Sequence, residues 1–218
     1  MTGALTRYVL ADALRAERWA GPVLLYLAGT TAFDVGLGSA LSCYSFTASL
    51  LLPVSLWLTI AIGNSEDQTQ AAITIVTVGS PLRVLLAKLL TGYLVSLPLA
   101  GFGVLWALIT AHPVTPTALI AGAGAHLLCA LLGVAAAAPL IRPVLDRLAW
   151  VVFLSVGLVL AETTIPGCPP VRSLLVLFAH EPLAVGPVAA TLSLITLETA
   201  ALATVLIAAG HRLGRYRR

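Results

Sequence analysis

Long apolar runs separated by short polar segments dominate this chain of 218 residues. A helix that crosses a bilayer needs about 20 predominantly apolar residues, because the hydrocarbon layer holds no water to satisfy the backbone polar groups. Only 10% of the residues are charged, whereas a soluble domain usually carries about a quarter. The sequence therefore predicts an all-α polytopic membrane protein, with a single transmembrane domain over residues 1–218. Six transmembrane helices are expected, over residues 20–38, 45–63, 81–110, 118–140, 148–161 and 183–209.

Three segments outside these runs have patterns of their own. Residues 1–19 place basic side chains near one helical face and apolar ones roughly opposite, which predicts an interfacial helix. A frayed basic tail is the alternative for that segment. Residues 64–80 are expected to form a cytoplasmic helix too short to span the bilayer. Residues 162–182 include the proline-rich and glycine-containing stretch "ETTIPGCPPVR", which predicts a re-entrant segment on the outer side.

The distribution of lysine and arginine predicts the orientation, because cytoplasmic loops carry an excess of both. With six spans, nearly all basic residues of the termini and connections lie on one side, and only Arg172 lies opposite. Both termini and residues 64–80 are then cytoplasmic. The Ala-, Leu-, Val- and Arg-rich, lysine-poor composition indicates a GC-rich bacterial genome, so the expected location is the inner (plasma) membrane of a bacterium.

The segment between the second and third runs starts with a helix signal. Ser65 with Gln68 fits a capping box, in which the serine caps the helix and the glutamine reaches back. Glu66 and Asp67 would face the positive end of the helix dipole. These residues predict a helix over 66–78 that docks at the membrane surface.

The end of this short helix is also marked in the sequence. Gly79 suits the position just past the helix, Ser80 can cap the next helix, and Pro81 fits that helix's first position. Two helices joined by a sharp corner are therefore expected. The alternatives are an ordinary cytoplasmic loop and a β segment, because residues 73–78 are β-branched.

The stretches "EDQTQ" and "GSPLRVLLAKLL" together resemble the cytoplasmic segment of type-2 ABC exporter permeases. In this sequence Glu66 and Asp67 match the acidic positions of the family, Thr69 its threonine and Lys88 its lysine. Two features depart from the family. The acidic patch lacks a flanking arginine, and Ala87 stands where the family usually has glycine.

The resemblance implies that residues 64–80 form a coupling helix, which sits in a groove of a separate P-loop ATPase subunit. It implies ATPase docking by Glu66, Asp67, Thr69 and Lys88. Gln70 and Thr74, which recur with Asp67 at helical spacing on one side, are expected to dock with them. Two ATPase subunits, which bind ATP and Mg, would work with two six-span chains, identical or related. The sequence contains no P-loop and no common hydrolase motif, so the chain is expected to be a non-catalytic subunit without a cofactor of its own. Membrane lipid is a further expected partner, and nucleic acid is not.

Three ionisable residues in the expected spans are candidates for a substrate path, because such groups are costly in a bilayer. Glu198 lies in the middle of the last span, where a structural hydrogen bond is the alternative role. Asp34 lies in the outer half of the first span, within reach of the headgroups. His126 has no histidine or carboxylate at helical spacing, so a packing role is its alternative and no metal site is expected. In the same run, Gly122 and Gly133 predict close helix packing.

The predicted function is export of a hydrophobic or amphipathic substrate, such as a drug (multidrug export), a lipid-like molecule or a peptide. The haem exporter of cytochrome c maturation, whose permease is similar in size and layout, is an alternative within the family. A proton-coupled carrier using Glu198, an unrecognised membrane enzyme and a structural or immunity subunit are alternatives outside it. A carrier should often show internal repeats, which this sequence does not.

Overall fold

The computed structural model describes residues 2–33, 38–111, 114–145, 148–164, 171–179 and 185–216. Within these ranges the chain forms α-helices and no strand. The helices are α1 (Thr2–Arg15), α2 (Ala20–Phe33), α3 (Ala40–Gly63), α4 (Gln68–Val78), α5 (Pro81–Thr110), α6 (Pro116–Ala137), α7 (Leu148–Thr164), α8 (Val171–Phe178) and α9 (Val185–Tyr216). The predicted all-α class is confirmed, and the β alternative for residues 73–78 is wrong, because they lie in α4.

Four helices in the described part of the chain are long and apolar enough to cross a membrane: α3, α5, α6 and α9. The helices α2 and α7 are apolar but shorter, with 14 and 17 residues. α3 begins at Ala40, five residues before the predicted second span, because Ser39 caps it by accepting a hydrogen bond from the Ser42 N–H at 3.2 Å. Several apolar helices of this length indicate a multi-pass membrane protein.

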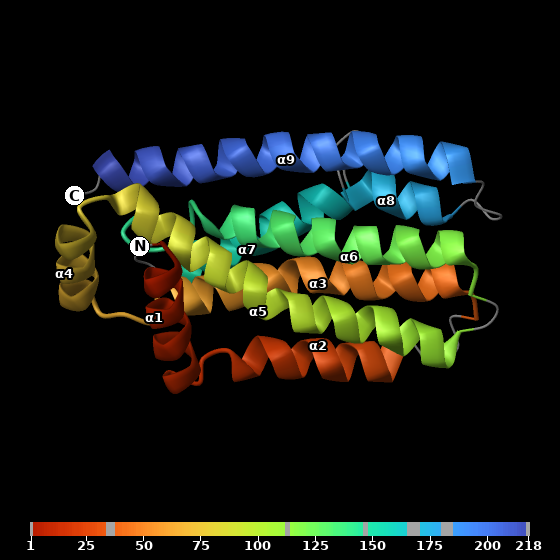
Figure 1. Ribbon diagram of the computed structural model, residues 1–218, viewed down its shortest axis with the longest axis horizontal. Helices are drawn as coiled ribbons and strands as arrows, with labels where there is room; N and C mark the ends of the chain where they lie inside the picture. Colours follow the sequence, from red (N-terminus) through yellow and green to blue (C-terminus); the bar gives the residue numbers. More distant parts are fainter. Residues whose placement is uncertain are drawn as a thin grey trace.

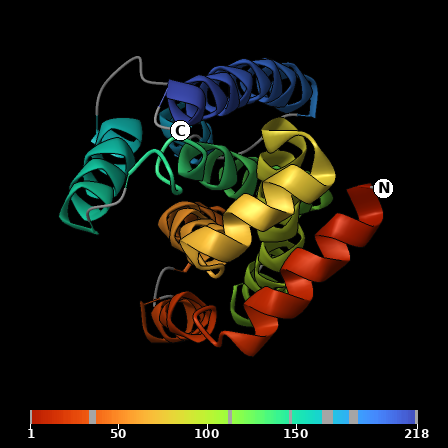
Figure 2. The same cartoon turned by 90° about the vertical axis from the view of Figure 1, so that its left-hand side faces the viewer.

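The long helices lie side by side, with α2 and α9 at opposite edges of the bundle (Figure 1). At one end α1 runs across the bundle, and α4 lies beyond it (Figures 1 and 2). The start of α1 and the last turns of α9 are at this same end, which we call the α4 end. Since residues 2–15 are helical, the frayed-tail alternative for the N-terminus is wrong. Val9 and Ala13 bury the inner face of α1, mainly against α5.

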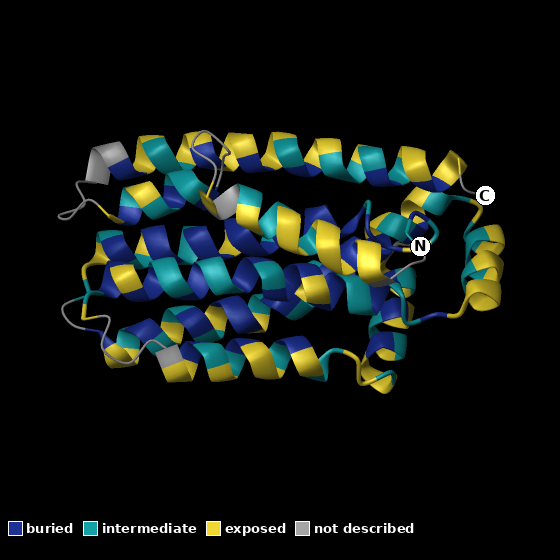
Figure 3. Ribbon diagram, turned by 180° about the vertical axis from the view of Figure 1, so that it is seen from behind, coloured by how far each residue is buried: buried dark blue, intermediate teal, exposed yellow. Residues whose placement is uncertain are grey.

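The core lies between α3 and α6, in the middle of the bundle (Figure 3), whereas α9 exposes most of its length. Small residues allow α3 and α6 to approach closely. A Cβ on Gly133 would lie 2.5 Å from the Leu52 carbonyl oxygen, and one on Gly122 would lie 2.5 Å from the Tyr44 ring. The close packing predicted from these two glycines is confirmed.

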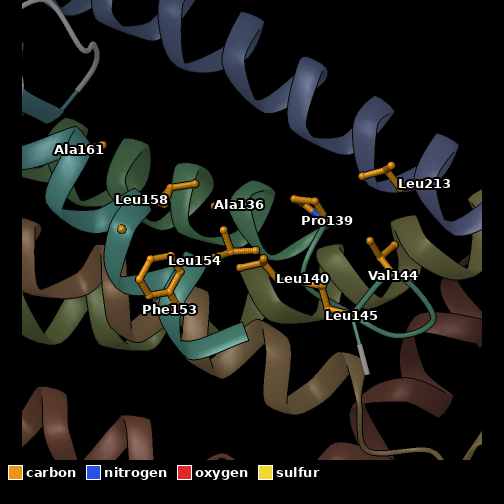
Figure 4. Close-up of a pocket in the computed structure, with 11 residues that line it drawn as sticks. Ala136, Pro139, Leu140, Val144, Leu145, Phe153, Leu154, Leu158, Ala161 and Leu213 are labelled. Atoms are coloured by element: carbon orange, nitrogen blue, oxygen red, sulfur yellow. The ribbon is translucent and has the colours of Figure 1, made fainter. Parts of the chain in front are cut away.

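α7 stands apart from the rest of the bundle (Figure 2) and leaves an apolar groove on either side. One groove, of about 710 Å³, separates α7 from α3. The other, of about 620 Å³, separates α7 from the end of α6 and from α9 (Figure 4). Phe153 and Leu154 of α7 line this second groove, opposite Leu140 and Leu213. An apolar helix held this loosely has side chains available for lipid or for another chain.

The predicted re-entrant segment, residues 162–182, is described only in part. It contains α8, a helix of eight residues that buries Val171, Leu174 and Phe178. Residues 165–170 and 180–184 lie outside the described residues. The short helix therefore packs on the protein interior through one face, with its apolar residues at helical spacing.

Candidate functional site

α4 begins two residues later than predicted, and a different residue caps it. Asp67 is extended, and its carboxylate accepts a hydrogen bond from the Gln70 N–H at 2.7 Å. The predicted capping box of Ser65 and Gln68 is wrong, because the Ser65 hydroxyl instead donates to a carbonyl at the end of α3 at 2.9 Å. Aspartate caps a helix as well as serine does, and this later start leaves Glu66 outside α4.

The corner after α4 agrees with the prediction. Gly79 has a left-handed conformation with φ of 70°, and its N–H donates to the Ile75 carbonyl. Ser80 caps α5 by accepting a hydrogen bond from the Arg83 N–H at 3.4 Å, and Pro81 is the first residue of α5. The glycine tolerates this left-handed turn without a Cβ clash, so the chain can turn from α4 directly into a membrane helix.

A buried ion pair ties the segment before α4 to α5. Lys88 Nζ lies 2.9 Å from Glu66 Oε2, and the two side chains are only 8% and 2% exposed. Lys88 also donates to the Gly63 carbonyl oxygen at 2.9 Å. Glu66 Oε1 accepts hydrogen bonds from Tyr8 of α1 at 3.2 Å and from Thr74 of α4 at 3.0 Å. This single carboxylate therefore joins α1, α4 and α5.

The structure brings together four of the six residues assigned to docking. Glu66 pairs with Lys88 and accepts from Thr74, and the Gln70 amide donates to the Tyr8 hydroxyl at 2.6 Å. Asp67 and Thr69 are exposed and lie outside this cluster. Tyr8 is a site residue that the sequence did not indicate, because it lies 58 positions before Glu66 and its own surroundings contain no motif.

The outer face of α4, formed by Thr69, Ile73 and Val76, points away from the cluster. All three residues are exposed, and the side chains of Ile73 and Val76 reach 62% and 81% exposure. The spacing of three and four residues places them along one stripe of the helix. A short helix beyond the bundle thus combines a buried polar anchor with an apolar outer surface.

Protonation of Glu66 should weaken this anchor, so we expect the protein to lose stability on acidification. Burial acts to raise the pKa of Glu66, but the charge of Lys88 and the hydrogen bonds from Lys88, Thr74 and Tyr8 outweigh it and hold the pKa below its ordinary value. With the folded pKa below the unfolded one, the stabilisation is complete above the unfolded pKa and is lost as the pH falls through the folded pKa.

This loss can be measured by thermal unfolding in detergent from about pH 7 down to about pH 3, across the range in which carboxylates titrate. Glu66→Gln should unfold at a lower temperature at neutral pH and should show a smaller fall on acidification. Asp67→Asn, which changes the neighbouring exposed carboxylate, should keep most of the wild-type fall. If the unfolding temperature fell equally with pH in the wild type and in Glu66→Gln, the acid-induced loss of stability could not be assigned to Glu66.

The residues proposed for a substrate path do not form one cluster in the described part of the chain. Glu198 is exposed on α9. His126 is fully buried in α6, where its Nδ1 lies 2.7 Å from the Gly122 carbonyl oxygen and its Nε2 lies 3.0 Å from Thr47 Oγ1 of α3. Asp34 lies outside the described residues. His126 thus occupies a packed, hydrogen-bonded position.

No group of three histidine, cysteine, aspartate or glutamate side chains that could hold a metal ion occurs among the described residues. No family model, curated protein or solved structure matches this chain. The geometry around α4 and the resemblance of its sequence therefore carry the functional argument.

Proposed function

We propose that this chain is the permease subunit of a type-2 ABC exporter, with α4 as the coupling helix that docks on a separate P-loop ATPase. The observation that carries this proposal is the arrangement of α4. It is a short helix beyond the bundle that exposes Ile73 and Val76 and is anchored to α5 by the Glu66–Lys88 pair. A buried ion pair supported by hydrogen bonds resists separation, so a movement of α4 is transmitted to α1 and α5.

The proposed topology has six spans, formed by α2, α3, α5, α6, α7 and α9, with α1 at the interface and α8 in the re-entrant segment. The short α2 and α7 would be accommodated by local thinning of the bilayer. Both termini and α4 would be cytoplasmic, in the inner membrane of a bacterium. The common position of α1, α4 and the last turns of α9 at the α4 end supports this arrangement (Figure 1).

In the proposed mechanism two copies of this chain, or this chain and a related one, work with two ATPase subunits that bind ATP and Mg. Closure of the ATPases would move α4 and change access to a path between the two permease chains. The substrate class would be a hydrophobic or amphipathic drug, lipid-like molecule or peptide. The exposed apolar surfaces of α2, α7 and α9 support both a second chain and an apolar substrate.

The test is whether a P-loop ATPase co-purifies with the tagged chain after gentle extraction from its native membrane. We expect mass spectrometry to find one, and we expect Ile73→Asp with Val76→Asp to abolish the association. Both side chains are exposed, so this variant should fold normally. Substituting Glu66 would not be a clean test, because it would also break the buried ion pair.

A matched control is Leu14→Asp with Tyr216→Asp, which adds the same two charges at other exposed apolar positions, 51% and 88% exposed. The control should retain the ATPase. Retention of the ATPase by the α4 variant would show that α4 is not the docking element. If no ATPase appears under conditions that preserve other membrane complexes, the proton-coupled carrier becomes the better hypothesis, with Glu198→Gln tested in a proton-driven transport assay.

A further inference from the structure

The groove between α3 and α7, which we call the α3–α7 groove, has an unusual distribution of polar residues. Its walls are mainly apolar, with Leu56, Trp57 and Ile60 on α3 facing Val152 and Val156 on α7. Two arginines and an asparagine line the same groove. The asparagine directly follows α3, so these polar groups lie where the groove reaches the α4 end.

Asn64 holds the two arginines at this place. The Arg18 side chain donates from Nη1 to the Asn64 backbone oxygen at 3.0 Å. The Arg142 backbone N–H donates to Asn64 Oδ1, also at 3.0 Å. Both arginines are exposed, and neither forms an ion pair with another described residue. Two guanidinium groups that no carboxylate of the described residues neutralises therefore lie at one end of an apolar groove.

The length of the groove matches one leaflet of a bilayer. Its lining on α3 extends from Pro53 to the residue after the helix, Asn64. At 1.5 Å per residue, that stretch is about 16 Å long. The hydrocarbon core of a bilayer is about 30 Å thick, so one leaflet contributes about half of it. The arginines are then at headgroup depth, and Pro53 is near the middle of the membrane.

We propose that the α3–α7 groove binds one anionic phospholipid, with its phosphate between Arg18 and Arg142 and an acyl chain along α3 and α7. Guanidinium groups bind phosphate through paired, charge-assisted hydrogen bonds. Basic pockets between membrane helices on the cytoplasmic side are suited to anionic headgroups. The proposal goes beyond the exporter hypothesis and does not depend on ATPase docking.

The second groove beside α7 provides a comparison within the same molecule. It is of similar size, but the described residues of its lining include no charged one: they are residues such as Phe153, Leu158 and Leu213 (Figure 4). That groove can take an acyl chain or another apolar group, and its described lining offers no group that would select a headgroup. Selectivity for an anionic lipid should therefore depend on the α3–α7 groove alone.

The experiment is a titration of the purified, delipidated full chain in detergent with phosphatidylglycerol, with the unfolding temperature and native mass spectrometry as readouts. We expect phosphatidylglycerol to raise the unfolding temperature and one lipid to remain bound per chain. Phosphatidylethanolamine with the same acyl chains should give a smaller rise. Arg18→Gln with Arg142→Gln should raise the half-saturating concentration of phosphatidylglycerol about tenfold or more, since two charge-assisted contacts are removed.

The control Arg83→Gln with Arg215→Gln removes the same charge from exposed positions at the α4 end and should keep the wild-type titration. Val156→Trp should block binding by filling the groove with no change of charge, which keeps the proposal testable if the arginine variant does not fold. The proposal would be overturned if the two lipids raised the unfolding temperature equally, or if both double arginine variants lost the same affinity for phosphatidylglycerol. Either result would indicate diffuse attraction between the basic surface and the lipid. The same stabilisation by inorganic phosphate alone would also overturn it.

Discussion

Lys88→Met is expected to destabilise the folded protein by about 3–5 kcal/mol, because it leaves the Glu66 carboxylate buried without its counter-charge. The two side chains are 2.9 Å apart and almost entirely excluded from solvent. An exposed pair would contribute only about 0–1 kcal/mol, so the burial decides the size of the effect. Methionine retains most of the apolar stem of the lysine and keeps the cavity filled.

The measurement is the free energy of unfolding of the purified protein in mixed micelles, for the wild type, both single variants and the double variant. Glu66→Gln with Lys88→Met should be more stable than Lys88→Met alone, because no unpaired charge remains. A loss below about 1 kcal/mol for Lys88→Met would show that the pair behaves as a solvated surface contact. Arg83→Met, at an exposed position on the same helix, should have little effect.

The double variant also tests whether the Glu66–Lys88 pair couples movement of α4 to the membrane helices. If it does, the double variant should recover stability without recovering transport driven by the ATPase. The uncharged side chains keep the volume of the pair but lose its charge-assisted contact, so α4 would no longer be held rigidly to α5. Recovery of both properties together would assign the pair a structural role alone.

Local chain signals were sufficient to predict the corner between α4 and α5. Gly79, Ser80 and Pro81 each occupy the position that their own backbone preferences indicate, and no distant residue is needed to place them. The start of α4 was harder to predict. Ser65 and Asp67 have similar capping preferences, so the choice between them depends on tertiary contacts rather than on sequence.

The role of Glu66 depends on such contacts. Both Glu66 and Lys88 stand out in the sequence. The sequence suggested that Glu66 interacts with the dipole of the short helix, but in the structure Glu66 lies outside α4 and pairs with Lys88. Glu66 is bonded to Tyr8 of α1 and Lys88 of α5, and their separation in the sequence gives no sign of this meeting. A cluster formed by three elements becomes visible only when those elements are packed.

The loose position of α7 could not be predicted for a different reason. In a membrane an apolar side chain is equally suited to lipid and to a neighbouring helix, so hydropathy does not distinguish a packed helix from a separated one. Phe153 and Val156 are compatible with a packed helix and with a separated one, although here their side chains are 66% and 53% exposed. Small residues are more informative, because glycine at a helix contact marks a close backbone approach.

Gly133 makes the closest of these approaches, and Gly133→Val is expected to destabilise the protein by about 3 kcal/mol, the upper end of the usual range for overpacking. A Cβ at this position would lie 2.5 Å from the Leu52 carbonyl oxygen and 3.1 Å from the Leu56 nitrogen, and it would also meet Ser55 Oγ. The serine hydroxyl can rotate away. The two backbone atoms belong to the central helix α3, so relief requires α3 and α6 to separate along the core.

Gly101 of α5 is the matched control, because nothing lies within 4 Å of the position where its Cβ would be. Gly101→Ala should stabilise the protein by up to about 1 kcal/mol through helix propensity, whereas Gly133→Ala should destabilise it despite the same gain. The measurement is the free energy of unfolding of both variants in mixed micelles. If the change has opposite signs for the same substitution, the effect of the clash is separated from that of helix propensity. If Gly133→Ala proved as stable as Gly101→Ala, α3 and α6 would have to be farther apart than they are here, and the core between them would need another explanation.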